Sequence, residues 1–410
     1  MKVVKSDFKS FYKKNDLSEL HNIHSYTAKL IPHIPKYIVE TYSEQDNLIL
    51  DPFCGSGTTL VEAVTAKRIT IGMDINPLAI LISNVKVANY DLIELESAIK
   101  EVNSLINKKR IYNHINFPNI NYWFSRKAKK ELNVIINAID KISNKFSDEV
   151  ISFLLICFSS IIRKSSFADP KISKVYKSKF VIQKIEDGWK PTPLLFFSEN
   201  CDKYYNILKN SSQKFKKTKL FCKDISQIKT TLKNYESKID LIITSPPYIC
   251  AQDYYRTFKL EVLWCNLLNS QNYSLLKKFF LGNEFVNSRV RTEINLNNKV
   301  YKNITKRISA IDEKKGTVVL DFFSRMEKFI IDSHHMLKPN GKLCLITGNS
   351  NICGIKIPTF KILNKIAEEN NFSLKKIYSD EIKSRNLFKN RNHDGGHIKE
   401  EFVSILEARK

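Results

Sequence analysis

Long apolar runs are missing from this chain of 410 residues. A membrane-spanning helix needs ~20 predominantly apolar residues, and the most apolar stretch, residues 151–162, is shorter than that. The first 14 residues carry charges and no apolar core, unlike a signal peptide. We therefore expect a soluble, cytoplasmic protein that has no membrane partner.

Cysteine is present but is poorly placed for metal or disulfide chemistry. The eight cysteines include no Cys-x-x-Cys pair, so their spacing predicts neither a zinc site nor a disulfide framework. Three histidine pairs also lack companion ligands at metal-binding spacing: His21/His24, His334/His335 and His393/His397. We predict that the protein binds no metal.

Acidic residues are outnumbered, with 42 Asp and Glu against 66 Lys and Arg, for a net charge of +24. A positive excess of this size is typical of proteins that bind polyanions, because neutralised phosphates release their counterions. A chain rich in Lys, Asn and Ile is also what an AT-rich genome would encode. Charge alone leaves both explanations open.

Glycine is scarce, at 11 residues, and two glycines stand close together at positions 55 and 57. They follow a short apolar strand, residues 48–50, in the segment Asp-Pro-Phe-Cys-Gly-Ser-Gly-Thr-Thr. Glycine lets the backbone turn sharply and approach a ligand closely, and the N-terminus of the next helix presents free N–H groups. No Gly-Lys-Ser/Thr ending follows, which argues against a P-loop.

A carboxylate follows the next strand, residues 69–73, at Asp74. Doubly wound nucleotide-binding folds place at this point the acid that accepts hydrogen bonds from both ribose hydroxyls. The alternative is a helix N-cap, since Asn76 and Pro77 open a helix. Strand, loop, helix and strand in this order predict a doubly wound α/β fold.

The sequence Ser-Pro-Pro-Tyr follows another apolar strand, residues 239–243. An exocyclic amino nitrogen of a nucleobase is a poor nucleophile because its lone pair is delocalised into the ring. Ser245 Oγ and the carbonyl of Pro246 could accept its two N–H bonds and favour a pyramidal nitrogen, and Pro247 helps to stiffen the turn that preorganises them. Tyr248 could stack on the base, at roughly 1–3 kcal/mol, comparable to the cost of flipping a base out of a duplex.

The glycine loop and the Ser-Pro-Pro-Tyr turn together resemble the paired signatures of the DNA amino-methyltransferases, which use S-adenosyl-L-methionine to methylate an exocyclic amino group. That resemblance implies a Rossmann-like methyltransferase sheet with a largely helical insertion between a cofactor half and a catalytic half. It places Asp51 and Phe53 near the methionine end of the cofactor, and Asp224 near its adenine unless Asp224 is an ordinary exposed turn residue. The cofactor residues that it implies are Asp51, Pro52, Phe53, Gly55, Gly57, Thr58, Asp74, Ile75 and Asp224, and the catalytic residues are Ser245, Pro246, Pro247 and Tyr248.

Three further segments are similar to a bacterial group of DNA methyltransferases: the cofactor-capping segment at residues 24–32, residues 74–79 and residues 395–401. Ser rather than Asp or Asn before Pro-Pro-Tyr resembles the cytosine-N4 branch, although the glycine loop comes first here, unlike the usual order in that branch. Adenine N6, or a base amino group in RNA, is the alternative target. A non-catalytic DNA-binding subunit is a more distant hypothesis.

Two other readings of the Ser-Pro-Pro-Tyr turn are weaker. A Pro-Pro-Tyr turn can serve as a proline ligand without chemistry, but this one follows a strand in a chain with a cofactor loop. Cytosine carbon-5 methyltransferases resemble one another in a Pro-Cys pair, whereas Cys250 lies four residues beyond Pro246. We interpret Cys250 as a small packed residue.

The domain organisation that we predict has three parts. Residues 1–90 form the cofactor half, although the first 20 residues are polar and are expected to be loosely ordered; residues 218–410 form the catalytic half. Residues 91–217 form the helical, basic insertion, whose loop-like part from Arg163 to Trp189 is the first candidate for reading DNA. The second is residues 283–316, with Arg289 and Arg291, within a basic loop at residues 269–316. For both candidates a solvated basic loop is the alternative. The expected partners are double-stranded DNA and, from the family setting of restriction–modification, a cognate restriction endonuclease.

Overall fold

The computed structural model describes residues 2–211, 214–250, 254–283, 299–382 and 400–410. Its centre is an eight-stranded sheet in the order β1-β9-β10-β6-β5-β2-β3-β4, and in the described part β10 alone runs antiparallel to its neighbours. The strands are β1 (Val4–Lys5), β2 (Leu48–Asp51), β3 (Ile69–Asp74), β4 (Thr218–Cys222), β5 (Ile239–Thr244), β6 (Leu337–Gly348), β9 (Phe372–Glu381) and β10 (Glu400–Ala408), with a separate hairpin of β7 (Ser350–Ile352) and β8 (Ile355–Ile357).

Both faces of the sheet are covered by helices, and the strand side chains alternate between the faces. Ile49 and Leu241 pack towards α1 (His33–Tyr42) and α2 (Thr58–Thr65). Their neighbours Leu50 and Ile242 share a core with the helices of the opposite face, which are α10 (Ile228–Thr231), α15 (Glu313–Met336) and α16 (Thr359–Glu369). The predicted doubly wound α/β fold is confirmed, and its sheet is mostly parallel.

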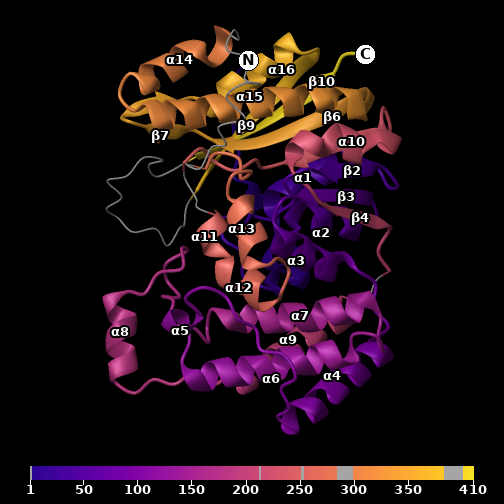
Figure 1. Cartoon of the computed structure of the whole chain (residues 1–410). Helices are drawn as coiled ribbons and strands as arrows, with labels where there is room; N and C mark the ends of the chain where they lie inside the picture. The colour runs from indigo at the N-terminus through magenta and orange to yellow at the C-terminus, as the bar shows by residue number, and fades with distance from the viewer. Residues whose placement is uncertain (1, 212–213, 251–253, 284–298, 383–399) are drawn as a thin grey trace.

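The helices between β3 and β4 in the chain begin with α3, and the later ones form a stack below α2 and α3 in the view of Figure 1. Trp264, the last residue of α12 (Lys259–Trp264), is fully buried there against Phe117, Phe124 and Phe158. The segment after the Ser-Pro-Pro-Tyr turn therefore packs into the core of the insertion. The helices of this region are α3 (Pro77–Val87), α4 (Leu92–Asn107), α5 (Ile120–Trp123), α6 (Arg126–Ile142), α7 (Asp148–Ile162), α8 (Lys179–Glu186) and α9 (Pro193–Asn210).

The expectation of a loosely ordered N-terminus is wrong for the described residues. Phe8 is fully buried and packs edge-on against Tyr37 and Tyr378, and β1 pairs in parallel with β9 at the edge of the sheet. Three short 3-10 turns follow β1 between Phe8 and Asn22. One aromatic anchor and two paired residues are enough to order a segment whose composition is polar.

The two regions expected to be basic loops are also partly helical. Residues 269–316 contain α13 (Ser270–Leu276) and α14 (Lys299–Ser309), and α15 begins within them at Glu313. The stretch from Arg163 to Trp189 contains α8. Polar outer faces hide the helical spacing, which in α14 is carried by a few buried residues such as Tyr301 and Ile308. Residues 284–298 and 383–399, with Arg289, Arg291, His393 and His397, lie outside the described residues.

Candidate active site

The sheet brings the two predicted motifs to one edge. β2 and β5 are parallel neighbours, with Ile49 opposite Leu241, so the glycine loop and the Ser-Pro-Pro-Tyr turn leave adjacent strands in the same direction. The strand order reverses between β2 and β5, and open α/β sheets bind ligands at such a switch point. Two adjoining pockets of about 660 and 620 Å³, open solvent included, lie there.

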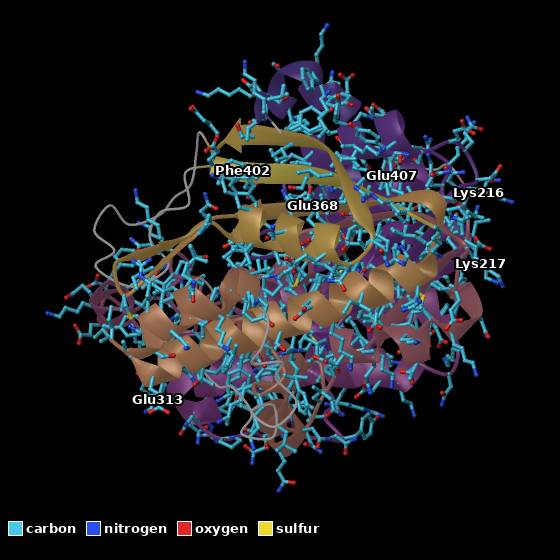
Figure 2. All side chains as sticks on the ribbon, turned by 90° about the horizontal axis from the view of Figure 1, so that it is seen from above. Lys216, Lys217, Glu313, Glu368, Phe402 and Glu407 are labelled. Atoms are coloured by element: carbon cyan, nitrogen blue, oxygen red, sulfur yellow. The ribbon has the colours of Figure 1, made fainter. Side chains whose placement is uncertain are left out.

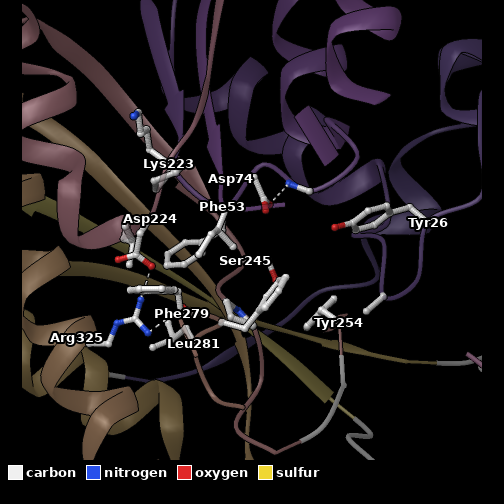
Figure 3. A pocket seen from close by; sticks show the side chains of 17 residues that line it. Tyr26, Phe53, Asp74, Lys223, Asp224, Ser245, Tyr254, Phe279, Leu281 and Arg325 are labelled. Carbon is white, nitrogen blue, oxygen red and sulfur yellow. Dashed lines mark hydrogen bonds and ion pairs between the residues drawn. The ribbon is translucent and has the colours of Figure 1, made fainter. Parts of the chain in front are cut away.

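The two pockets share Tyr26, Ala28, Phe53, Gly55, Ser245 and Tyr254. The first pocket also contains Pro52, Asp74, Ile75, Asp224 and Pro247, and the second contains Asp51, Thr58, Pro246 and Tyr248. Every predicted site residue except Gly57 therefore lines at least one pocket. Figure 3 shows Asp74 and Tyr26 on one side of the first pocket, and Asp224 and Arg325 on the other, with Phe53 and Ser245 between them.

The glycine loop has a tightly specified backbone. Gly57 has φ +77°, and a Cβ at this position would lie 2.8 Å from Ser83 Oγ, so a larger residue does not fit. Gly57 is also the N-cap residue of α2. Ser56 lines the second pocket, and its buried hydroxyl has no hydrogen-bond partner in the described part of the chain. Lys86 is fully buried and donates to the Ser56 carbonyl at 2.9 Å.

Asp74 is held by the backbone around it. Its two carboxylate oxygens accept hydrogen bonds from Gly55 N at 2.9 Å and Asn76 N at 2.8 Å, while burial raises its pKa to about 6. The N-cap of α3 is Asn76, whose side chain accepts from Leu78 N. Asp74 is thus not the capping residue, and its carboxylate lines the first pocket.

Asp51 joins the two motifs. It is 3% exposed at the end of β2, and its Oδ1 accepts from Thr244 Oγ1 at 2.8 Å and Phe53 N at 3.2 Å. Thr244 immediately precedes Ser245, so this contact ties the end of β5 to the glycine loop. Burial raises the pKa of Asp51 to about 6.

Asp224 has a cationic partner that sequence reasoning missed. Its carboxylate lies 2.6 Å from Arg325 Nη2 of α15 and also accepts from Ser226 N at 2.9 Å. Arg325 Nη1 donates to the carbonyl of Phe279 at 3.0 Å. Arg325 and the segment from Phe279 to Leu281 consequently form a wall of the first pocket, although no local sequence pattern marks them.

The segment expected to cap the cofactor does lie over the pockets. Tyr26 stacks on Phe258 with ring centroids 4.4 Å apart. His24 and Ala28 have φ of +57° and +56°, a backbone conformation that is uncommon for residues other than glycine. His24 Nε2 lies 3.0 Å from Ser159 Oγ of α7, which anchors the segment to the helical insertion. Lys29 lines the second pocket.

The Ser-Pro-Pro-Tyr turn lies at the junction of the pockets. Ser245 lines both of them, and the Tyr248 hydroxyl donates to Glu401 Oε1 of β10 at 2.8 Å. Cys250 is half-buried with φ +54°, and its backbone N–H donates to Gly282 O. Across the described residues, no group of three or more His, Cys, Asp and Glu side chains could hold a metal ion, and no helix is long and apolar enough to span a bilayer.

The strand order, with a glycine loop after β2 and a polar turn after β5, defines a doubly wound α/β domain that has two adjoining pockets at its switch point. Residues 5–84 match the family model for N6/N4 methyltransferases, described as DNA methylase. The matched segment contains the capping segment, the glycine loop and Asp74.

Relatives with similarity over most of the chain are type II methyltransferases. M.MvaI of Kocuria varians is 26% identical over 393 residues, which cover 89% of this chain and 85% of that protein. M.BsoBI of Geobacillus stearothermophilus is 23% identical over 418 residues, with coverage of 90% and 81%. Among solved structures, the rRNA methyltransferase aviRa of Streptomyces viridochromogenes matches with a TM-score of 0.34 and 8% identity, covering 98% of this chain and 96% of that one. A score this low adds nothing to the fold described above.

The expected resemblance to DNA amino-methyltransferases is confirmed at the level of the N6/N4 family match and the type II relatives. These matches do not distinguish cytosine N4 from adenine N6.

Proposed function

We propose that this protein is a site-specific DNA methyltransferase that acts on the exocyclic amino group of a flipped base, with cytosine N4 favoured, in a restriction–modification system. The observation that carries the proposal is the position of Ser245 at the junction of two pockets. An acceptor at this point could hold an amino group beside a methyl donor that is bound across the two pockets. The N6/N4 family match and the type II relatives support the reaction class.

The residues of both pockets suit S-adenosyl-L-methionine. In this assignment Asp74 accepts from the ribose hydroxyls, Ile75 contacts the adenine, and Asp224, fixed by Arg325, lies at its edge. Phe53, which lines both pockets, lies towards the methionine end. The second pocket offers groups for an amino acid, which include the carboxylate of Asp51, Lys29, the N-terminus of α2 at Thr58 and the buried Ser56 hydroxyl. When bound, this cofactor supplies an electrophilic methyl group.

The chain itself positions the nucleophile. Ser245 Oγ and the Pro246 carbonyl accept the two N–H bonds of the amino group, which favours a pyramidal nitrogen with an available lone pair. Pro247 restricts the turn, and the contact from Thr244 to Asp51 fixes its first residue. Because these acceptors are preorganised, little reorganisation is needed when the reaction begins. Tyr248 provides a stacking surface for the flipped base.

We further propose that residues 91–217 contribute target recognition through an aromatic–lysine surface. Tyr122, Tyr176 and Phe180 are 54%, 56% and 57% exposed. Lysine ammonium groups lie over aromatic rings of this surface at 5.3 Å for Lys177 and Tyr122 and at 5.3 Å for Lys171 and Phe180. Figure 1 shows α8 at the left edge of the molecule, and α11 (Tyr254–Thr257), which follows the Ser-Pro-Pro-Tyr turn, above it and closer to the centre. Cationic and aromatic groups side by side suit a nucleic acid.

This surface can be tested by the salt dependence of DNA binding. Lys184 belongs to the same surface, with its ammonium group 4.3 Å from the centre of the Trp189 ring. Replacing Lys171, Lys177 and Lys184 by alanine should make the slope of log K against log salt shallower by about 0.9 for each phosphate that the protein no longer neutralises. A matched triple variant at the exposed residues Lys100, Lys108 and Lys109 of α4 and its end should keep the wild-type slope. Equal slopes for all three proteins would refute the assignment of the surface.

The reaction is tested by incubating the purified protein with radiolabelled S-adenosyl-L-methionine and unmodified duplex DNA, with bulk RNA in parallel. Nucleoside digestion and mass spectrometry then identify the product. N4-methylcytosine in DNA is the expected result, and N6-methyladenine would keep the mechanism and change the base. Label in RNA alone, or in neither nucleic acid, would refute the proposed function.

A further inference from the structure

β10 brings an acidic residue to the Ser-Pro-Pro-Tyr turn from the far end of the chain. Because β10 runs antiparallel to β6, it begins at the edge of the sheet where β5 and β6 end. Glu401, its second residue, pairs with Gly348, the last residue of β6. Glu401 is 8% exposed and lines the second pocket together with Ser245 and Tyr248.

The contact between the two side chains is a direct hydrogen bond, in which the Tyr248 hydroxyl donates to Glu401 Oε1 at 2.8 Å. Glu401 belongs to a strand that is paired on both sides, with Asp380 of β9 and Gly348 of β6. Tyr248 belongs to an irregular turn. The strand therefore offers a fixed acceptor, and a carboxylate makes stronger hydrogen bonds than a neutral acceptor does.

Resting on the proposed function, we infer that Glu401 is a positioning residue that holds the Tyr248 ring in the orientation on which the flipped base stacks. The backbone fixes one end of the tyrosine, and Glu401 fixes the hydroxyl at the other. A ring without this second anchor can rotate about its side-chain bonds, which weakens stacking and misplaces the amino group relative to Ser245.

The test compares Glu401→Ala, Glu401→Gln, Tyr248→Phe and the double variant Tyr248→Phe/Glu401→Ala on unmethylated genomic DNA that the wild-type protein methylates. Glu401→Ala should lower kcat/KM for DNA about tenfold while its affinity for S-adenosyl-L-methionine stays unchanged. Glu401→Gln retains an oxygen acceptor and should recover the rate to within about threefold of wild type. In the Tyr248→Phe background, Glu401→Ala should cost much less than it does in the wild type.

The matched control is Glu407→Ala on the same strand. Figure 2 shows Phe402 and Glu407 towards opposite ends of β10, and Glu407 pairs with Lys342 and Lys375, away from the pockets. This variant should keep the wild-type kcat/KM.

Three results would overturn the inference: an unchanged kcat/KM in Glu401→Ala, an equal loss in Glu401→Gln, or an equal effect of Glu401→Ala with and without the Tyr248 hydroxyl. A thermal midpoint for each variant identifies losses caused by unfolding, and Glu401→Gln then carries the test. Failure of the wild-type protein to methylate DNA would refute the proposed function itself, and the inference about Glu401 with it.

Discussion

Replacing Asp51 should raise the stability of the fold and weaken cofactor binding, because its charged carboxylate is buried where the two motifs meet. Burial raises its pKa from 3.8 to about 6. At 1.36 kcal/mol for each pKa unit, the ionised side chain costs about 3 kcal/mol of folding free energy above pH 7. Below pH 4 the Asp51 carboxyl is protonated in both the folded and the unfolded states. Between pH 4 and pH 6 it loses its proton in the unfolded state only, which lowers the free energy of unfolding. Stability from this group is therefore lost as the pH rises through about 6.

Asp51→Asn keeps an oxygen that can accept from Thr244 and Phe53 but removes the charge. We expect urea unfolding to show the variant more stable than wild type by about 3 kcal/mol at pH 8, with the difference shrinking towards zero at pH 4. The variant should also bind S-adenosyl-L-methionine more weakly, because residue 51, the proposed partner of the cofactor's amino group, no longer carries a negative charge.

The control for this experiment is Asp46→Asn, since the Asp46 side chain is 63% exposed and pairs with Lys216 at the surface. Its stability should follow the wild-type pH dependence. A difference between Asp51→Asn and wild type that is the same at pH 4 and pH 8 would contradict the argument from burial of the charge. A less stable variant at pH 8 would contradict it as well.

Three further predictions concern the candidate site. Ser245→Ala should lower kcat roughly 100-fold and leave the Kd of S-adenosyl-L-methionine near the wild-type value; an unchanged rate would exclude its hydroxyl as an acceptor. Asp74→Ala should raise that Kd at least tenfold, as measured by isothermal titration calorimetry, because two ribose hydrogen bonds are removed; unchanged binding would remove Asp74 from the site. Gly57→Ala should lose more stability than Gly188→Ala: both have positive φ, but only the first adds a clash, at 2.8 Å from Ser83. Equal losses of unfolding free energy in the two variants would show that Ser83 moves aside without destabilising the fold.

The parts of the fold and site that could be predicted from sequence are those that local patterns encode. The strand before the glycine loop, the loop and the acid after the next strand lie within a short stretch, so spacing was enough to predict them. Arg325 and Glu401 lie 101 and 153 residues from their partners Asp224 and Tyr248. No local periodicity encodes contacts over such distances. They depend on the antiparallel pairing of β10 with β6 and on the position of α15 beside Asp224.

The helical insertion is joined to the rest of the protein by more than its two ends. Trp264, which lies after the Ser-Pro-Pro-Tyr turn, completes the insertion core, and Ser159 of the insertion lies within hydrogen-bond distance of His24, in the segment over the two pockets. An exchange of residues 91–217 between homologous proteins would break both connections at once. If the insertion is exchanged as the target-recognition unit proposed above, the exchanged unit must also include the segment around Trp264 and a matching N-terminal segment, and the three parts are expected to evolve together.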